Sequence, residues 1–166
     1  MKIETLEDLF VEQLCDIHFA ETKLTKALPQ MAKHATDPKL KQGFEKHLKE
    51  TNDQIAKIER VMASLGLKVK SEKCEAILGL IKEADDLIAH IKDKEVLDAA
   101  LVLAAQKVEH YEIATYGSLC AIARRLGYDA EAEILHSILE QEKATDEALT
   151  KLAESAPGLN QRAKAA

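Results

Sequence analysis

The sequence predicts an all-α protein: a bundle of four long helices with an additional helix that connects two of them. Alanine, leucine, lysine and glutamate dominate the 166 residues, and aromatic residues, which strands favour, make up only 4%. Apolar residues recur with the three-and-four spacing of amphipathic helices along most of the chain. Short runs that contain proline or glycine separate these patterns. A chain of this length is most simply one domain, covering residues 1–166.

The first two long helices are expected at residues 5–35 and 37–65. The run Thr36-Asp37-Pro38 ends the first helix and starts the second, with Asp37 as the N-cap and Pro38 at the first helical position. The inward stripe of the first helix contains one acidic residue among apolar ones: Phe10, Leu14, Ile17, Glu21, Leu24, Leu28 and Met31.

Three more helices are expected at residues 72–92, 94–126 and 129–155. Each carries its own apolar register, and Gly127 marks the turn between the last two. The tail, residues 156–166, follows an Ala-Pro-Gly run and is expected to fray.

Several acidic residues fall at inward positions of these helices. Glu109 and Glu112 lie one helical turn apart and continue the apolar register of the helix over 94–126. A buried carboxylate costs several kcal/mol unless its charge is compensated, so two on one face indicate a metal site. The other candidate ligands lie on or beside the inward stripes of three further helices: Glu21, Glu50, Glu142 and Asp146.

The spacing of these residues places four carboxylates at one depth in the bundle. Two antiparallel helices share a depth at positions equidistant from their turn. Glu21 and Glu50 are equidistant from the turn between the first two helices, and Glu112 and Glu142 are equidistant from Gly127. At ~1.5 Å per residue, each pair lies roughly 20 Å from its turn. The chain therefore looks like two copies of one helical hairpin packed face to face.

The helix over 72–92 determines how the two hairpins are connected. If it runs along the bundle as a crossover, the helices over 37–65 and 94–126 are parallel. The spacing equally allows an up-down-up-down bundle with this helix folded outside.

Three polar side chains near the acidic residues have roles that the sequence leaves open. His47, which precedes Glu50 by one turn, is either a metal ligand or a hydrogen-bond donor to a ligand. Gln54 has the same two roles, and the hydrogen-bonding one is favoured. Asp146 is either a ligand or a partner of a neighbouring Thr or Lys.

The arrangement Glu…Glu…Glu-x-x-Glu…Glu over four helices resembles that of the ferritin-like superfamily, so the fold class is a ferritin-like four-helix bundle with an additional connecting (crossover) helix. Three segments make nearly the whole chain similar to the YciE/YciF family of bacterial stress-associated proteins: Lys-Val-Glu-His-Tyr-Glu-Ile-Ala-Thr-Tyr-Gly at 107–117, His-Leu-Lys-Glu-Thr at 47–51 and Glu-Gln-Glu-Lys-Ala-Thr-Asp at 140–146. The resemblance implies a rubrerythrin-like bundle, a homodimer and a site for two metal ions, but no established reaction. It further implies that Glu50 and Glu112 are central, bridging carboxylates, and that Glu21, Glu109 and Glu142 are more terminal.

The chain departs from the usual ferritin-like pattern in its nitrogen ligands. Di-iron sites of this superfamily usually carry Glu-x-x-His on the second and fourth helices, whereas the positions one turn after Glu50 and Glu142 are Asp53 and Thr145 here. An oxygen-rich site favours hard ions, so iron or manganese is expected. The sequence also has no Cys-x-x-Cys segment of the rubredoxin type, which weakens the comparison with rubrerythrin peroxidases.

Three functions from different classes follow from these observations. The first is a di-metal oxidoreductase that acts on O₂ or peroxide, with ferroxidase, peroxidase or catalase-like chemistry. The second is a non-catalytic metal-binding protein, in which ions neutralise the carboxylates and stabilise the bundle. The third is a metal-free helical scaffold that acts through dimerisation or a partner. The third is disfavoured because carboxylates gathered near one point repel one another in the absence of cations.

Charge and cysteine usage exclude other classes. A net charge of −6 argues against binding to nucleic acid or to an anionic membrane surface. No run approaches the ~18 apolar residues of a membrane span. Cys15, Cys74 and Cys120 are widely spaced and odd in number, which predicts reduced thiols and a cytoplasmic location.

Overall fold

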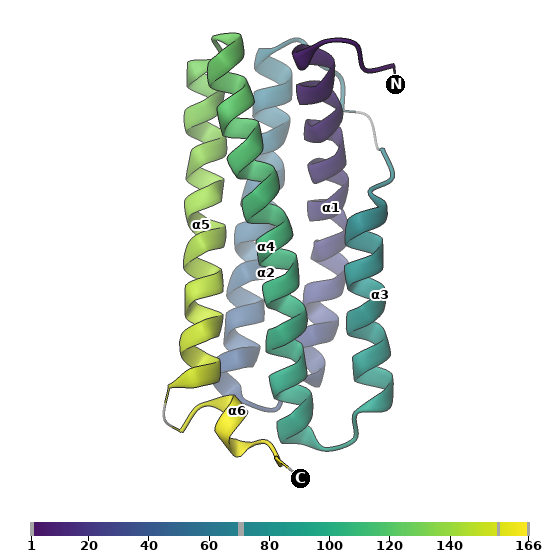
Figure 1. Ribbon diagram of the computed structural model, residues 1–166, viewed down its shortest axis with the longest axis vertical. Coiled ribbons are helices and arrows are strands. Elements are labelled where there is room, and N and C mark those ends of the chain that lie inside the picture. Colours follow the sequence, from purple (N-terminus) through teal and green to yellow (C-terminus); the bar gives the residue numbers. More distant parts are fainter. Residues whose placement is uncertain (1, 70–71, 156, 166) are drawn as a thin grey trace.

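The computed structural model describes residues 2–69, 72–155 and 157–165. Its long helices are α1 (Leu6–His34), α2 (Pro38–Ser64), α4 (Lys94–Leu126) and α5 (Asp129–Glu154). As Figure 1 shows, α3 (Glu75–His90) connects α2 to α4, and the short α6 (Leu159–Arg162) follows α5. No strand occurs in the described residues, which confirms the all-α prediction.

The four long helices form the bundle, and α3 is a crossover along its side (Figure 1). α1 runs from the N-terminal end of the molecule to the opposite end, and α2 returns. α3 then carries the chain across again, so that α4 runs parallel to α2 and α5 runs parallel to α1. α1 and α5 each pack against both α2 and α4, while α3 packs on α4 and α1. The crossover is therefore the correct one of the two connections that the spacing allowed.

Several helices begin or end at capping residues that are recognisable in the sequence. Thr5 and Asp8 form a capping box at the start of α1, with hydrogen bonds of 3.0 Å and 2.9 Å between side chain and backbone. Asp37 caps α2 by accepting from the amides of Lys39 and Leu40. Gly127 ends α4 in the left-handed conformation, with φ of 81°, which a residue with a Cβ adopts at a cost.

Asp98 joins the two hairpins at the end of the bundle where α1 turns into α2. Its buried carboxylate accepts from the Thr36 amide at 2.8 Å, the Thr36 hydroxyl at 2.6 Å and the Asp37 amide at 2.9 Å. These contacts fix the start of α4 against the α1–α2 turn. They thereby set the height at which the residues of α4 face those of α1 and α2.

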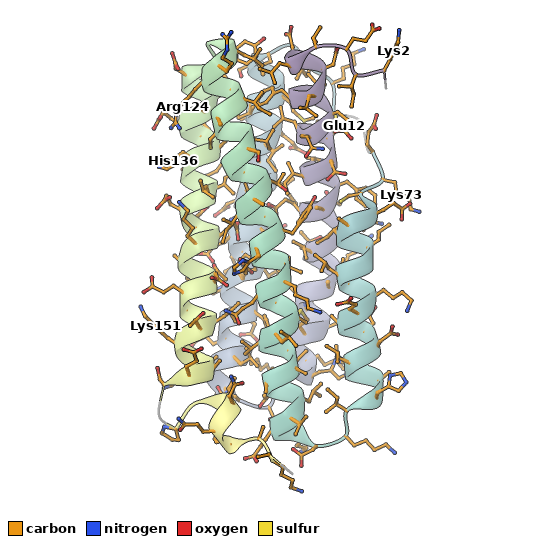
Figure 2. All side chains as sticks on the ribbon, viewed as in Figure 1. Lys2, Glu12, Lys73, Arg124, His136 and Lys151 are labelled. Atoms are coloured by element: carbon orange, nitrogen blue, oxygen red, sulfur yellow. The ribbon has the colours of Figure 1, made fainter. Side chains whose placement is uncertain are left out.

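The core is polar at mid-height and, apart from Asp98, apolar towards both ends of the bundle. Buried apolar side chains on all four long helices include Phe10, Ile17, Leu40, Ile58, Leu119 and Leu135. Between them lie buried polar side chains, namely Glu21, His47, Thr51, Gln54, Glu109, Glu112 and Glu142. Many outward-facing residues are charged or polar, as Glu12, Arg124, His136 and Lys151 illustrate in Figure 2, although Leu103 is 54% exposed. None of the described helices is long and apolar enough to span a membrane.

Residues 157–165, the described part of the tail that was expected to fray, include α6, which contacts α4 and α5. Leu159 of α6 is buried, and Arg162 forms an ion pair of 2.6 Å with Asp37. Gly158 permits this return of the chain, because a Cβ there would overlap the carbonyl oxygen of Ala153. The expectation missed these contacts because they join the tail to residues distant in sequence.

Candidate metal centre

Four buried side chains from three helices meet at mid-height of the bundle. His47 of α2, Glu109 and Glu112 of α4 and Glu142 of α5 each offer one ligand atom, and these atoms all lie within 4.8 Å of one another. We call this set the central cluster. The spacing of Glu109 and Glu112 places both on one face of α4, as two residues one helical turn apart must be.

His47 is the member of the central cluster that offers nitrogen atoms. Its Nε2 lies 3.3 Å from Oε1 of Glu109 and 3.9 Å from Oε2 of Glu142. Its Nδ1 lies 3.8 Å from Oε2 of Glu50. The imidazole is only 4% exposed, and neither of its nitrogens has a hydrogen-bond partner in the described part of the chain.

Two of the buried glutamates, Glu142 and Glu21, are oriented by hydrogen-bond donors. The side-chain amide of Gln54 donates to Oε1 of Glu142, and the hydroxyl of Tyr116 donates to Oε1 of Glu21. In each carboxylate the second oxygen, Oε2, is left without a hydrogen-bond partner among the described residues. Such outer hydrogen bonds fix the direction in which a carboxylate presents its free oxygen.

The remaining polar atoms of this region are buried and unpaired. Within the described residues they are Oε2 of Glu21, Glu50, Glu109 and Glu142, both carboxylate oxygens of Glu112, Oε1 of Gln54 and both ring nitrogens of His47. Native proteins rarely leave buried polar atoms without partners, and each costs about 1–3 kcal/mol or more. All but the amide oxygen of Gln54 are carboxylate oxygens or imidazole nitrogens, the ligands that iron, manganese and zinc take. The donor set therefore fits a bound cation.

The pKa values of the buried acids also indicate a bound cation. Burial, and the neighbouring charge of Glu142, raise the pKa of Glu21 to about 8. Burial raises the pKa of Glu109 and Glu112 well above the usual range, with the nearby carboxylates adding to the effect, and it also raises the pKa of Glu142. Without a cation, these groups therefore retain protons that a free carboxylic acid would lose.

Glu50 and Glu21 lie beside the central cluster and differ in their exposure to solvent. Glu21 is fully buried, whereas the side chain of Glu50 is 21% exposed and pairs with Lys46 at 2.7 Å. His47 and Lys46 beside it hold the pKa of Glu50 below its usual value. Glu50 therefore carries a negative charge at the edge of a site whose inner acids favour the protonated form.

Asp146 lies apart from the central cluster. Its carboxylate accepts from the Gln106 amide at 3.1 Å and lies 3.4 Å from Nε2 of His110. Both of these neighbours lie on α4, and neither is the Thr or Lys that the sequence suggested.

The sequence interpretation did not single out Gln106 or Lys46, which fix Asp146 and Glu50. Gln106 precedes Glu109 by one turn and also donates to Thr150 at 2.8 Å. A search for polar residues one turn from each inward acid would have found Gln106. Lys46 carries no such signal, because it resembles the other lysines on the solvent-facing side of α2.

Comparison with known proteins gives matches over nearly the whole chain. A family model described as a domain of unknown function (DUF892) matches residues 5–164. Protein YciF of Escherichia coli strain K12 is 49% identical over 154 residues, which cover 92% of this chain and 93% of YciF.

Two solved structures share the fold at high identity. The crystal structure of YciF, described as an E. coli stress protein, has a TM-score of 0.91 at 46% identity, covering 97% of this chain and 100% of that one. YcfI of Rhodopseudomonas palustris, described as a candidate structural protein, has a TM-score of 0.90 at 49% identity, covering 92% of this chain and 97% of that one.

Proposed function

This chain belongs to the DUF892 family and is 49% identical to YciF, and we start our proposal from that relationship. We propose that the chain is a stress-associated protein with a carboxylate-bridged dinuclear metal centre. Two iron or manganese ions would be held at mid-height of the bundle. The observation that carries this proposal is the set of buried carboxylate oxygens and imidazole nitrogens that have no hydrogen-bond partner among the described residues.

The residues divide into three roles in this proposal. Glu109, Glu112, Glu142 and His47 form the central cluster and would bind metal directly. Glu21 and Glu50 flank it and supply further carboxylate oxygens, which is why we propose two ions in place of one. Six free carboxylate oxygens of these residues and one imidazole nitrogen of His47 make seven donor atoms, one more than an octahedral ion takes.

The surrounding side chains would support the ligands without binding metal. Gln54 and Tyr116 hold the carboxylates of Glu142 and Glu21 by hydrogen bonds. Asp146 is proposed as part of this outer layer, where it accepts from Gln106. Metal binding displaces the protons that burial favours on the inner glutamates, so the affinity for metal rises with pH.

When bound, such a pair of ions supplies redox chemistry towards O₂ or peroxide, of the ferroxidase, peroxidase or catalase type. The chain's own contribution is a largely buried site in which imidazole and carboxylates are held in place before the ions arrive. A homodimer is proposed as the assembly, as the resemblance to the YciE/YciF family implies.

The test is anaerobic loading of the full chain with Fe(II) or Mn(II), followed by addition of O₂ or H₂O₂. The proposal expects about two ions bound per chain and consumption of the oxidant that requires them. A Glu109→Gln variant should lose both, whereas Glu140→Gln, which changes an exposed glutamate of α5, should retain both.

A second function, non-catalytic metal binding, has an observation of its own in its favour. The related YcfI is described as a candidate structural protein. Under this alternative, the loaded chain binds the ions and gains stability but consumes no O₂ or H₂O₂. The same experiment therefore separates the two functions.

A further inference from the structure

An apolar pocket of about 540 Å³ opens between α2 and α5 and ends at the metal centre. Its inner wall consists of apolar side chains from all four long helices, including Leu24, Leu28, Phe44, Val108 and Leu149. Its inner end is formed by His47, Glu50 and Glu109. The volume falls within the range of about 300–1,000 Å³ that is typical of small-molecule sites.

Small residues keep the mouth of this pocket open. Gly43 on α2 and Ala144 and Ala148 on α5 all line the pocket, and all three are exposed. A glycine within a helix costs about 1 kcal/mol relative to alanine. No close approach of the backbone explains Gly43, because a Cβ built there meets nothing within 4 Å. The space beside it is therefore open, and a larger side chain would enter it.

The charges around the pocket are distributed unevenly. The buried glutamates of the metal centre lie at one end and disfavour a second anion there. Lysines lie along the rim: Lys46 is paired with Glu50, and Lys151 with Glu147. Lys39 forms no ion pair with any residue that the structure describes, and it lies roughly 12 Å from His47 along α2 at ~1.5 Å per residue.

We propose that this pocket binds a medium-chain carboxylic acid, with its carboxylate at Lys39 and its alkyl chain along the apolar wall towards His47 and Glu109. The long apolar wall matches an alkyl chain, and the unpaired cation at the far end matches a single negative charge. The ligand would place its hydrocarbon end beside the metal centre. Its binding does not require the metal, because protein side chains alone form the pocket.

Calorimetric titration of the full chain with decanoate, as isolated and again after chelation, tests the proposal. One decanoate per chain should bind saturably under both conditions, so a failure of the metal hypothesis would leave this result unaffected. Decyltrimethylammonium, which has the same alkyl chain but a positive head group, should bind at least ten-fold more weakly.

Two pairs of variants locate the ligand. Gly43→Leu fills the pocket and should weaken decanoate binding at least ten-fold, whereas Gly79→Leu, at an exposed glycine of α3 that also has open space beside it, should bind like the parent. Lys39→Glu should also weaken binding at least ten-fold. Lys41→Glu, which changes a lysine of the same helix outside this pocket, should not.

Three results would overturn the proposal. They are the absence of saturable binding, equal affinity for decanoate and its cationic analogue, and unchanged affinity in Gly43→Leu or Lys39→Glu. Sedimentation of each variant detects the other possible occupant. If Gly43→Leu dissociates an oligomer and decanoate does not bind, then a second copy of the chain fills the pocket and the proposal is wrong.

Discussion

Glu112 has unfavourable surroundings for a charged residue. It is fully buried, and neither of its carboxylate oxygens has a hydrogen-bond partner. Its neighbours Glu21, Glu109 and Glu142 are acidic as well, and together with burial they raise its pKa well above the usual range. Glu112 therefore destabilises the metal-free protein, whereas its carboxylate would stabilise a bound cation.

Glu112→Gln should therefore have opposite effects on metal binding and on the metal-free fold. Metal affinity should fall by at least about 100-fold, more than the loss of an outer hydrogen bond causes. The free energy of unfolding of the metal-free protein should stay equal or rise, because an amide cannot ionise among the other carboxylates. Competition with a chelator and urea denaturation measure the two effects. If the variant bound metal as tightly as the parent, the centre would be misassigned.

Gln54 tests the outer layer at the same scale. Gln54→Leu removes the donor to Glu142 and so leaves that carboxylate less constrained. We expect metal affinity to fall by about 10–100-fold, which is less than in Glu112→Gln. Gln42→Leu, at an exposed position of the same helix, is the matched control. Unchanged affinity in Gln54→Leu would mean that Glu142 is held in place without this hydrogen bond.

At the scale of the elements, the alignment of the two hairpins depends on Asp98. Its three hydrogen bonds join the start of α4 to the α1–α2 turn. Hydrogen bonds to charged groups contribute about 1.5–3 kcal/mol each. The heights of α4 and of α1 and α2 determine which acids meet, so this contact also positions the metal centre.

Asp98→Ala should destabilise the protein by at least about 2 kcal/mol and weaken metal binding as well, since the Thr36 hydroxyl and the Thr36 and Asp37 amides lose their charged acceptor. Asp85→Ala, at an exposed site on α3, should change the free energy of unfolding by less than about 0.5 kcal/mol. Denaturant unfolding of both variants measures the difference. A loss in Asp98→Ala no larger than in the control would show that other contacts set the hairpin alignment.

The helices and their turns were accessible from the sequence because each depends on signals close together in the chain, whereas the spacing left two ways of connecting the hairpins. Periodicity placed Glu21, Glu109, Glu112 and Glu142 in the core, where all four are buried. Equal spacing from a turn put Glu21 level with Glu50, and Glu112 level with Glu142. Which of these residues bind metal stays a prediction.

Contacts between residues distant in sequence were not accessible in the same way. In the sequence, Asp98 looks like any other polar residue of a long helix, and the residues of α6 look like part of an unstructured tail. Asp146 shares the turn spacing of a ligand, yet Gln106 on the adjacent helix engages it. Periodicity reports the face on which a side chain lies but not the partner that it meets there.

At the scale of the whole molecule, the buried acids make stability depend on pH. The folded metal-free protein holds the proton of Glu21 up to a pKa of about 8, whereas the unfolded chain releases it near the ordinary value of 4.5. Between these values the folded state binds more protons, so its stability is greatest at low pH and falls as the pH rises towards 8.

We therefore expect the chelated protein to lose stability between pH 5 and pH 8, by up to about 1.4 kcal/mol per pH unit for each such group. Urea denaturation at several pH values measures this slope. Saturating metal should remove or reverse the slope, because metal binding requires deprotonated ligands. A flat profile in the chelated protein would mean that the acids are compensated without a cation.

The central claim is that cations compensate the buried acids at mid-height of the bundle. The most direct test is the metal content per chain, measured by elemental analysis on protein made without an affinity tag and never exposed to a chelator. The account predicts about two iron or manganese ions per chain. Protein that contains no metal, and that takes up none when Fe(II) or Mn(II) is added anaerobically, would contradict it and leave a protonated, hydrogen-bonded core in its place.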